Sequence, residues 1–211
     1  MRIALITENS QAAKNALIEQ ALCKVVAPMG HQVDNYGMAG SDDPHALTYV
    51  QNGILASILL TAGAADYVVT GCGTGQGAML ACNSFPNVLC GHVANPSDAY
   101  LFAQVNDGNC IAMPFAQGFG WGGELNLEYC FEKLFGFGSG NGYPPERREP
   151  EQRNKKILDA VRARTLRPLP ECLREIDPEL VRGAIAGDRF EALFFPHCKD
   201  KALAAWARSL R

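Results

Sequence analysis

The stretch DYVVTGCGTGQGAMLACN, residues 66–83, decides the fold. Its first part, Asp66–Thr70, is mostly apolar and β-branched and predicts a buried strand. A turn with glycine at every second position follows, Gly71–Gly77, and the apolar segment Ala78–Asn83 then predicts a helix. A strand that leads through a glycine-rich turn straight into a helix is typical of a parallel sheet with helical crossovers.

The same alternation extends to both sides of this stretch. The predicted strands are Arg2–Thr7, His31–Tyr36, Asp66–Thr70, Val88–Val93 and Asn109–Met113. The predicted helices are Ala12–Met29, His45–Ala62, Ala78–Asn83, Asn95 to about Val105, and Glu124–Phe135. We interpret the run Ser41-Asp42-Asp43-Pro44 as a cap with proline at the first position of the second helix. Right-handed crossovers put helices on both faces, which predicts a Rossmann-like three-layer α/β sandwich with a five-stranded parallel sheet.

The remainder of the chain has a different character. Residues 136–150 are rich in glycine and proline and predict an arm or linker. Beyond them we expect short helices separated by Pro168, Pro170 and Pro178, too apolar for a free tail and therefore packed on the body or on a neighbouring subunit. The predicted organisation is a Rossmann-like α/β domain over residues 1–140, an arm over 141–157 and a helical C-terminal extension over 158–211.

The composition is that of a folded globular protein. Hydrophobic residues make up 47% of the 211 residues and charged residues 19%, which argues against disorder. The net charge of −3 gives the whole chain no electrostatic attraction to nucleic acid. No apolar run reaches the roughly 18 residues that a membrane span needs. We therefore expect neither nucleic acid nor a membrane as a partner.

The eight cysteines do not form a metal-binding or disulfide pattern. None of them falls in a CxxC pair, so neither a zinc site nor a thioredoxin-like motif is indicated. Five have apolar neighbours, as small core residues do: Cys23, Cys82, Cys90, Cys110 and Cys130. Because no signal-peptide pattern opens the chain, we expect a reducing cytoplasmic location and no metal.

The chemistry is expected in the loop Gly71–Gly77. Ligands bind at the carboxyl ends of parallel strands, and glycines at a helix N-terminus let backbone N–H groups approach an anion. The spacing matches neither a P-loop nor, in its position after the third strand, a dinucleotide fingerprint. Cys72, beside such N–H groups, is expected to be partly thiolate near neutrality and able to abstract a proton α to a carbonyl. The residues alone leave a second interpretation open, in which Cys72 is only a small residue at a tight turn.

Together with a second segment, ANPSDAYLFAQVNDGN at residues 94–109, this loop resembles the family of ribose-5-phosphate isomerase type B and galactose-6-phosphate isomerase. The resemblance covers about residues 1–157 and also includes the segment Asp43-Pro44-His45-Ala46 and the pair Arg153 and Ile157. It implies aldose–ketose isomerisation of a small phosphorylated sugar through a cis-enediolate, without metal or cofactor. It also implies a homodimer or homotetramer with shared active sites, because the arginine arm of this family reaches the partner subunit.

By this resemblance each site residue has an expected role. Cys72 transfers the proton between C1 and C2, and Thr74 with the N–H groups of Gly73, Gly75 and Gly77 stabilises the oxyanion. Substrate contacts are expected from Glu8, Asn9, Asp43 and Asn106. The phosphate is expected to bind Arg148 and Arg153, whose planar guanidinium groups donate two hydrogen bonds at once. For Lys155, Lys156, Arg162 and Arg164 we prefer a solvated surface role.

Two departures from the family pattern limit the substrate assignment. The family's Asp-His pair in the first loop is Glu8-Asn9 here, and its ring-opening histidine is Val105, which cannot shuttle a proton. Three explanations stay open: another histidine such as His45 or His92 acts instead, the substrate is an acyclic sugar phosphate such as a tetrose phosphate, or the chain is part of a hetero-oligomer or inactive. The competing functions are a non-catalytic phosphosugar-binding module and, less favoured, a nucleotide-binding oxidoreductase.

Overall fold

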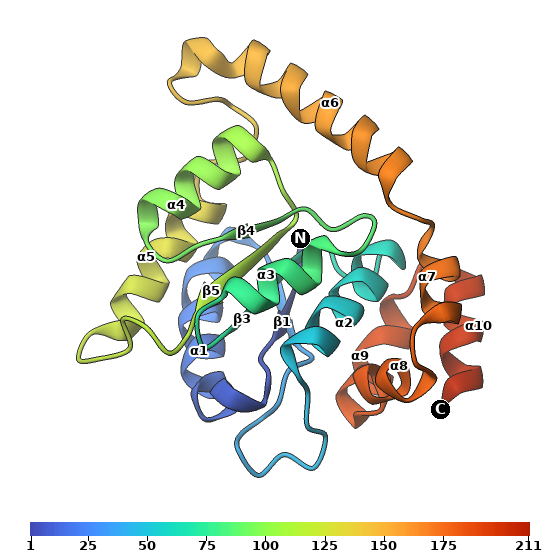
Figure 1. Ribbon diagram of the computed structural model, residues 1–211. Helices are drawn as coiled ribbons and strands as arrows, with labels where there is room; N and C mark the ends of the chain where they lie inside the picture. Colours follow the sequence, from blue (N-terminus) through green and yellow to red (C-terminus); the bar gives the residue numbers. More distant parts are fainter.

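The computed structural model describes residues 1–211 and contains one parallel five-stranded sheet with the order β2-β1-β3-β5-β4 (Figure 1). The strands are β1 (Arg2–Ile6), β2 (Gln32–Asn35), β3 (Tyr67–Cys72), β4 (Cys90–His92) and β5 (Cys110–Pro114). The strand order reverses between β1 and β3, so their carboxyl ends flank the crevice where ligands bind in such sheets.

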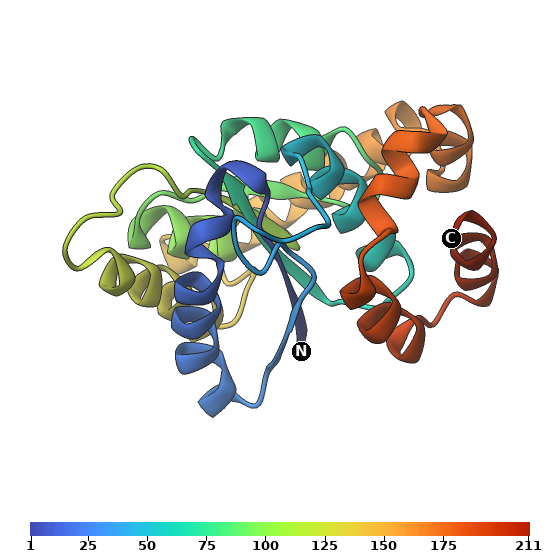
Figure 2. The same cartoon turned by 90° about the horizontal axis from the view of Figure 1, so that it is seen from below.

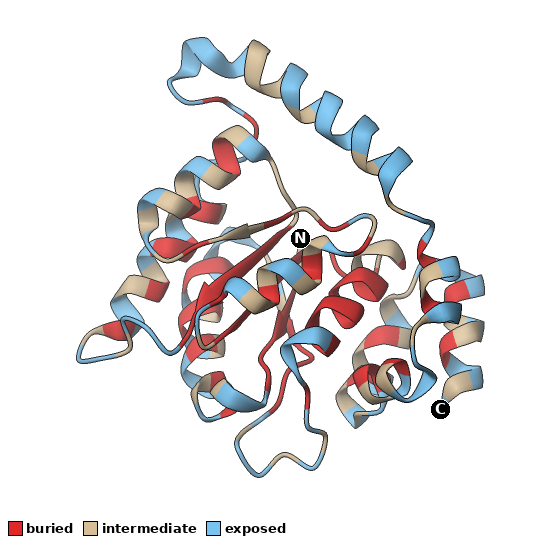
Figure 3. Ribbon diagram, in the orientation of Figure 1, coloured by how far each residue is buried: buried red, intermediate tan, exposed pale blue.

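Helices cover both faces of the sheet, as Figure 2 shows. One face carries α1 (Asn15–Val26), α4 (Pro96–Leu101) and α5 (Gly123–Phe135), and the other carries α2 (Tyr49–Thr61) and α3 (Gln76–Asn83). Every residue of β3 is buried, as the colour of this strand in Figure 3 shows. Alternate side chains enter the two cores, so that Val68 packs with α2 and α3, and Val69 with α1 and α5. The predicted three-layer α/β fold with five parallel strands is confirmed.

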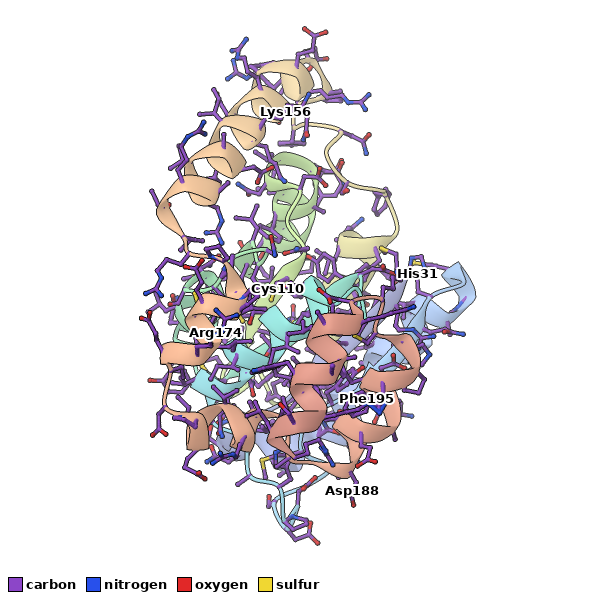
Figure 4. The ribbon with its side chains drawn as sticks, turned by 90° about the vertical axis from the view of Figure 1, so that its right-hand side faces the viewer. His31, Cys110, Lys156, Arg174, Asp188 and Phe195 are labelled. Atoms are coloured by element: carbon purple, nitrogen blue, oxygen red, sulfur yellow. The ribbon has the colours of Figure 1, made fainter.

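The C-terminal segment consists of five helices: α6 (Arg148–Thr165), α7 (Leu169–Glu175), α8 (Pro178–Ile185), α9 (Asp188–His197) and α10 (Lys201–Leu210). Helices α7–α10 pack against α2 and share its core, with the rings of Phe190 and Phe194 stacked at 4.4 Å between centroids. Figure 4 shows Phe195 in this group and Lys156 on α6, well away from it. The apolar residues of α7–α10 therefore pack on the body of the same chain.

Helix α6 differs from the others because none of its residues is buried (Figure 3). It crosses the top of the molecule in Figure 1, from the end of α4 to α7. Its carboxyl-terminal half is attached through Arg162, whose guanidinium donates to the carbonyl oxygens of Phe85 and Val88. None of the helices is both long and apolar enough to cross a bilayer.

The start of α2 corrects one sequence prediction. The helix does not begin after a cap at Ser41–Pro44 but at Tyr49, with Thr48 as its N-cap. Thr48 and Gln51 form a reciprocal capping box, in which each side chain bonds the backbone N–H of the other residue. The residues before Thr48 form an irregular loop that runs beside the carboxyl end of β1, where the Asn9 N–H donates to the Leu47 carbonyl at 2.8 Å.

Candidate functional site

The end of β3 and the loop after it require glycine at two positions. A Cβ at Gly71 would lie 2.3 Å from the Met113 carbonyl oxygen, so β5 packs directly on the backbone there. Gly75 has φ +75°, and a Cβ at this position would lie 2.8 Å from Nε2 of His92. The two glycines therefore let the backbone approach β5 at Gly71 and the His92 ring at the end of β4 at Gly75.

Three consecutive carbonyl groups of this loop are anchored to neighbouring strands and their extensions. Each oxygen accepts a hydrogen bond of 2.9 Å: that of Cys72 from the Phe115 N–H, that of Gly73 from the Ala116 N–H and that of Thr74 from Nε2 of His92. In a trans peptide the N–H group points away from the carbonyl group. Anchoring the three oxygens on one side therefore turns the three following N–H groups to the other side.

The N–H groups of Gly73, Thr74 and Gly75 donate to no acceptor within the chain. They immediately precede the N-terminus of α3, whose first N–H groups add positive dipole character. Free backbone donors next to a helix N-terminus are suited to binding an anion. The Cys72 side chain beside it is only 7% exposed, whereas Thr74 is exposed and its hydroxyl accepts from the Gln76 N–H at 3.4 Å.

The residues at the end of β1 border this loop. Glu8 is buried, and its carboxylate accepts from the Ser10 N–H at 2.9 Å and the Ser10 hydroxyl at 2.6 Å, so it caps the 3-10 helix Asn9–Lys14. Asn9 is exposed, and its side-chain amide forms no hydrogen bond within the chain. Of this pair, Asn9 is therefore free to contact a substrate.

Asp43 organises its own loop. Its carboxylate accepts from the N–H groups of Ala39 at 2.7 Å and His45 at 2.9 Å. Partial burial acts to raise the pKa of Asp43, but these two hydrogen bonds together with the nearby charge of Arg189 hold the pKa below the ordinary value. The imidazole of His45 faces the C-terminal extension, with Nε2 2.5 Å from the Gly183 carbonyl oxygen.

Sequence reasoning missed several neighbours of the loop. Nε2 of Gln11 lies 3.8 Å from the position of a Cβ on Gly73, and Oε1 of the same side chain accepts from Lys14 at 2.8 Å. The Lys14 ammonium also donates to the Phe115 carbonyl, which fixes the segment after β5. Gln11 and Lys14 could have been found from their spacing, because two polar residues three apart in a helical turn just after β1 lie on the same side of that turn.

The other predicted site residues, Asn106, Arg148 and Arg153, lie near the amino-terminal ends of the strands, whereas Cys72 lies at the carboxyl-terminal end of β3. Cys110, four residues after Asn106, pairs with Val68, whereas Cys72 pairs with the last residue of β5. Four residues along a strand correspond to about 13 Å. Asn106 is exposed at the end of a π-helical turn. The carbonyl of Gln104 in the same turn accepts from the Gly142 N–H, so the segment that leads into α6 starts at this amino-terminal end of the strands.

The basic residues of α6 fall into two groups. Lys155 is paired with Asp159 at 2.6 Å, and Arg162 is bonded to two carbonyl groups of the body. Arg148 and Arg153 are exposed and form no ion pair or side-chain hydrogen bond within the chain. A cavity of about 720 Å³ lies between α6 and the body, with Lys155, Asp159 and Arg162 in its lining, so the cavity is far from Cys72.

One group of side chains has the spacing of metal ligands. The Sγ atoms of Cys82, Cys90 and Cys110 lie within 4.8 Å of one another, and all three residues are buried. Burial raises the pKa of the Cys110 thiol well above its ordinary value, which disfavours the thiolate that a metal requires. Figure 4 shows Cys110 in the middle of the body, and we assign the three thiols to the core.

The sequence and the fold both match known sugar isomerases. A family model described as Ribose/Galactose Isomerase matches residues 3–125, and a second, described as Ribose-5-phosphate isomerase, matches residues 164–210. No curated protein sequence matches the chain.

Two solved structures are similar over the full length. One is a 4-deoxy-L-threo-5-hexosulose-uronate ketol-isomerase complexed with a tartrate, at 54% identity and a TM-score of 0.98, covering 100% of this chain and 99% of that one. The other is a ribose-5-phosphate isomerase from Vibrio parahaemolyticus, at 51% identity and a TM-score of 0.97, with the same coverage. A type B ribose 5-phosphate isomerase from Trypanosoma cruzi, 16% identical over 77% of this chain and 99% of that one, shares the fold at a TM-score of 0.64. The chain therefore belongs to the ribose/galactose isomerase family.

Proposed function

We propose that the chain is a cofactor-independent aldose–ketose isomerase for a small sugar phosphate, acting through a cis-enediolate with Cys72 as the base. The observation that carries this proposal is the row of three free N–H groups, on Gly73, Thr74 and Gly75, the residues that directly follow Cys72 in the chain. A proton abstraction next to a carbonyl group needs a base and donors for the oxygen that becomes negative, and this loop offers both. The isomerase names of the two full-length relatives disfavour a non-catalytic binding module.

Each group in the loop has a defined task in this mechanism. The Cys72 thiolate takes the proton from the carbon next to the carbonyl group and returns it to the former carbonyl carbon. Between these two steps the hydroxyl proton passes from the neighbouring oxygen to the former carbonyl oxygen, so that the negative charge moves across the cis-enediolate and a new carbonyl group forms. The negative enediolate oxygen accepts from the free N–H groups of the loop and of Gly77 in α3, with the Thr74 hydroxyl at the rim. Because these donors are already oriented by their anchored carbonyl groups, little reorganisation accompanies the charge development.

The remaining groups would come from a second subunit. The second group of predicted site residues lies near the amino-terminal ends of the strands, away from Cys72: Asn106, Arg148 and Arg153. One chain would therefore carry two separate halves of a site. Helix α6 also exposes apolar side chains, with Ile157 56% and Val161 50% exposed, which favours contact with another chain. A homodimer, or a homotetramer built from such dimers, would bring the Cys72 half of one subunit to the arginine half of its partner.

A second candidate is a ketol-isomerase for an acyclic sugar acid. Val105 cannot open a ring, and neither candidate histidine replaces it, because Nε2 of His45 faces the Gly183 carbonyl and Nε2 of His92 faces that of Thr74. The hexosulose-uronate named for the 54% identical relative has a ketone at C5 and no hydroxyl at C4, so it lacks the hydroxyls that close furanose and pyranose rings. Arg148 and Arg153 are suited to a carboxylate as well as to a phosphate.

Proton exchange with solvent distinguishes these substrates. The protein is incubated in heavy water with four-, five- and six-carbon aldose phosphates and with the acyclic uronate, and deuterium at the carbon next to the carbonyl is measured by NMR. We expect incorporation with at least one of them and its loss in Cys72→Ala, whereas Cys23→Ala, a half-buried thiol in α1, keeps it. Absence of deuterium from every substrate, or its persistence in Cys72→Ala, would refute the proposed reaction.

A further inference from the structure

His92 is the last residue of β4, and its ring contacts the loop that carries Cys72. Nε2 lies 2.9 Å from the carbonyl oxygen of Thr74. Because a carbonyl oxygen can only accept a hydrogen bond, Nε2 must carry a proton and donate it. The ring also closes against the backbone of Gly75, since a Cβ there would lie 2.8 Å from Nε2.

This contact differs in kind from the other two that anchor the loop. The oxygens of Cys72 and Gly73 accept from backbone N–H groups after β5, which almost any sequence could supply. The oxygen of Thr74 depends on one side chain. The next residue, Gly75, is a glycine at positive φ and therefore has wide conformational freedom unless its peptide group is held.

We propose that His92 is a positioning residue whose Nε2–H holds the Thr74 carbonyl so that the Gly75 N–H faces the enediolate oxygen. The inference rests on the proposed function, since it assigns a task within the same site. The imidazole does not touch the substrate in this role and transfers no proton. It sets the direction of one oxyanion donor through the planar Thr74–Gly75 peptide.

The kinetic test compares His92→Leu, which removes the donor, with His92→Gln, whose amide N–H can donate to the same carbonyl. Loss of an entire oxyanion donor lowers kcat by about 10²–10³, so misorientation of one donor in His92→Leu should lower kcat by about tenfold or more with KM nearly unchanged. His92→Gln should recover most of this loss. His197 is a matched control, because it is also half-buried and contacts a backbone carbonyl, that of Leu193, at 2.8 Å, but in α9. His197→Gln should keep wild-type kcat.

A spectroscopic test does not depend on turnover. The Gly75 amide resonance in ¹H–¹⁵N NMR spectra should shift in His92→Leu and return toward its wild-type position in His92→Gln. The Gly73 amide, whose peptide is anchored by the Phe115 N–H, should stay in place in both variants.

The outcomes separate this proposal from the function on which it rests. Wild-type kcat in His92→Leu, equal impairment of the two His92 variants, or an unmoved Gly75 resonance would overturn the positioning role. If wild-type protein turns over none of the substrates, the proposed function fails, and the Gly75 resonance still decides whether His92 orients this peptide.

Discussion

At the scale of single residues, Gly75 combines two constraints that can be separated by mutation. Gly75→Ala forces a side chain to φ +75° and puts its Cβ 2.8 Å from His92. Gly30→Ala imposes a similar strain at φ +78° with nothing within 4 Å of the new Cβ. We expect Gly30→Ala to lower the free energy of unfolding by about 1–2 kcal/mol, because it imposes a positive φ on alanine, and Gly75→Ala to lower it by more, because its Cβ also meets His92 and the Met113 backbone. Only Gly75→Ala should also lower kcat, and equal kcat values in the two variants would contradict the assigned role of the loop.

Asp43 is the second residue with a measurable signature. Its folded-state pKa is lowered by the N–H groups of Ala39 and His45, so its charge contributes stability above the unfolded-state value near 3.8. That contribution disappears as the pH falls through the lowered folded-state pKa. We therefore expect Asp43→Asn to be less stable than wild type at pH 6, with a difference that narrows below pH 4, in urea titrations at several pH values. KM should stay near wild type, and a large rise in KM with unchanged stability would instead assign Asp43 to substrate binding.

At the scale of elements, the strands and the first five helices could be predicted because periodicity and turn residues agree there. The glycine-rich loop and helix α3 follow β3, as the sequence predicts. Strand β3 is buried on both faces, which agrees with its continuous run of apolar residues. The start of α2 was missed because Pro44 is a strong local signal, whereas Thr48 and Gln51 cap only through side chains three residues apart. Helix was expected from residue 151 onward, but its start at Arg148 and its continuous length to Thr165 were not, because α6 buries nothing and lacks the apolar stripe from which helix bounds are recognised.

The C-terminal extension gives the prediction at this scale. Phe194 in α9 is fully buried, stacks on Phe190 and belongs to the same core as α2. Phe194→Ala should lower the free energy of unfolding by about 3–5 kcal/mol in a single cooperative transition, because the cavity opens in the shared core. Glu191→Ala in the same helix removes only an exposed ion pair with Arg211 and should cost less than about 1 kcal/mol. A separate early transition for the extension, seen by far-UV circular dichroism, would show instead that it folds independently.

At the scale of the whole molecule, the candidate site residues are divided between the carboxyl-terminal and the amino-terminal ends of the strands of one sheet. Local motifs could single out candidate residues, since Cys72 lies in a recognisable loop and Arg153 in a basic segment. They could not predict that Cys72 pairs with Pro114, the last residue of β5, and so lies about 13 Å along that strand from its first residue, Cys110. This distance depends on the register of the strands, which is a property of the assembled sheet. In the proposed mechanism the free guanidinium groups of Arg148 and Arg153 reach a substrate only if a second chain brings its Cys72 loop to them.

Subunit mixing tests this division directly. Cys72→Ala removes the base of one half-site, and the double variant Arg148→Ala/Arg153→Ala removes the anion ligands of the other, so each should be nearly inactive alone. If sites are shared, refolding equal amounts together gives hybrids in which one of two sites carries both intact halves, and about a quarter of wild-type activity should return. Mixing Cys72→Ala with a triple variant that lacks all three side chains should return none, because no intact pair can form. A mixture of the first two variants that stays as inactive as its components would show that each site is complete within one chain, and would confine Arg148 and Arg153 to the surface of α6.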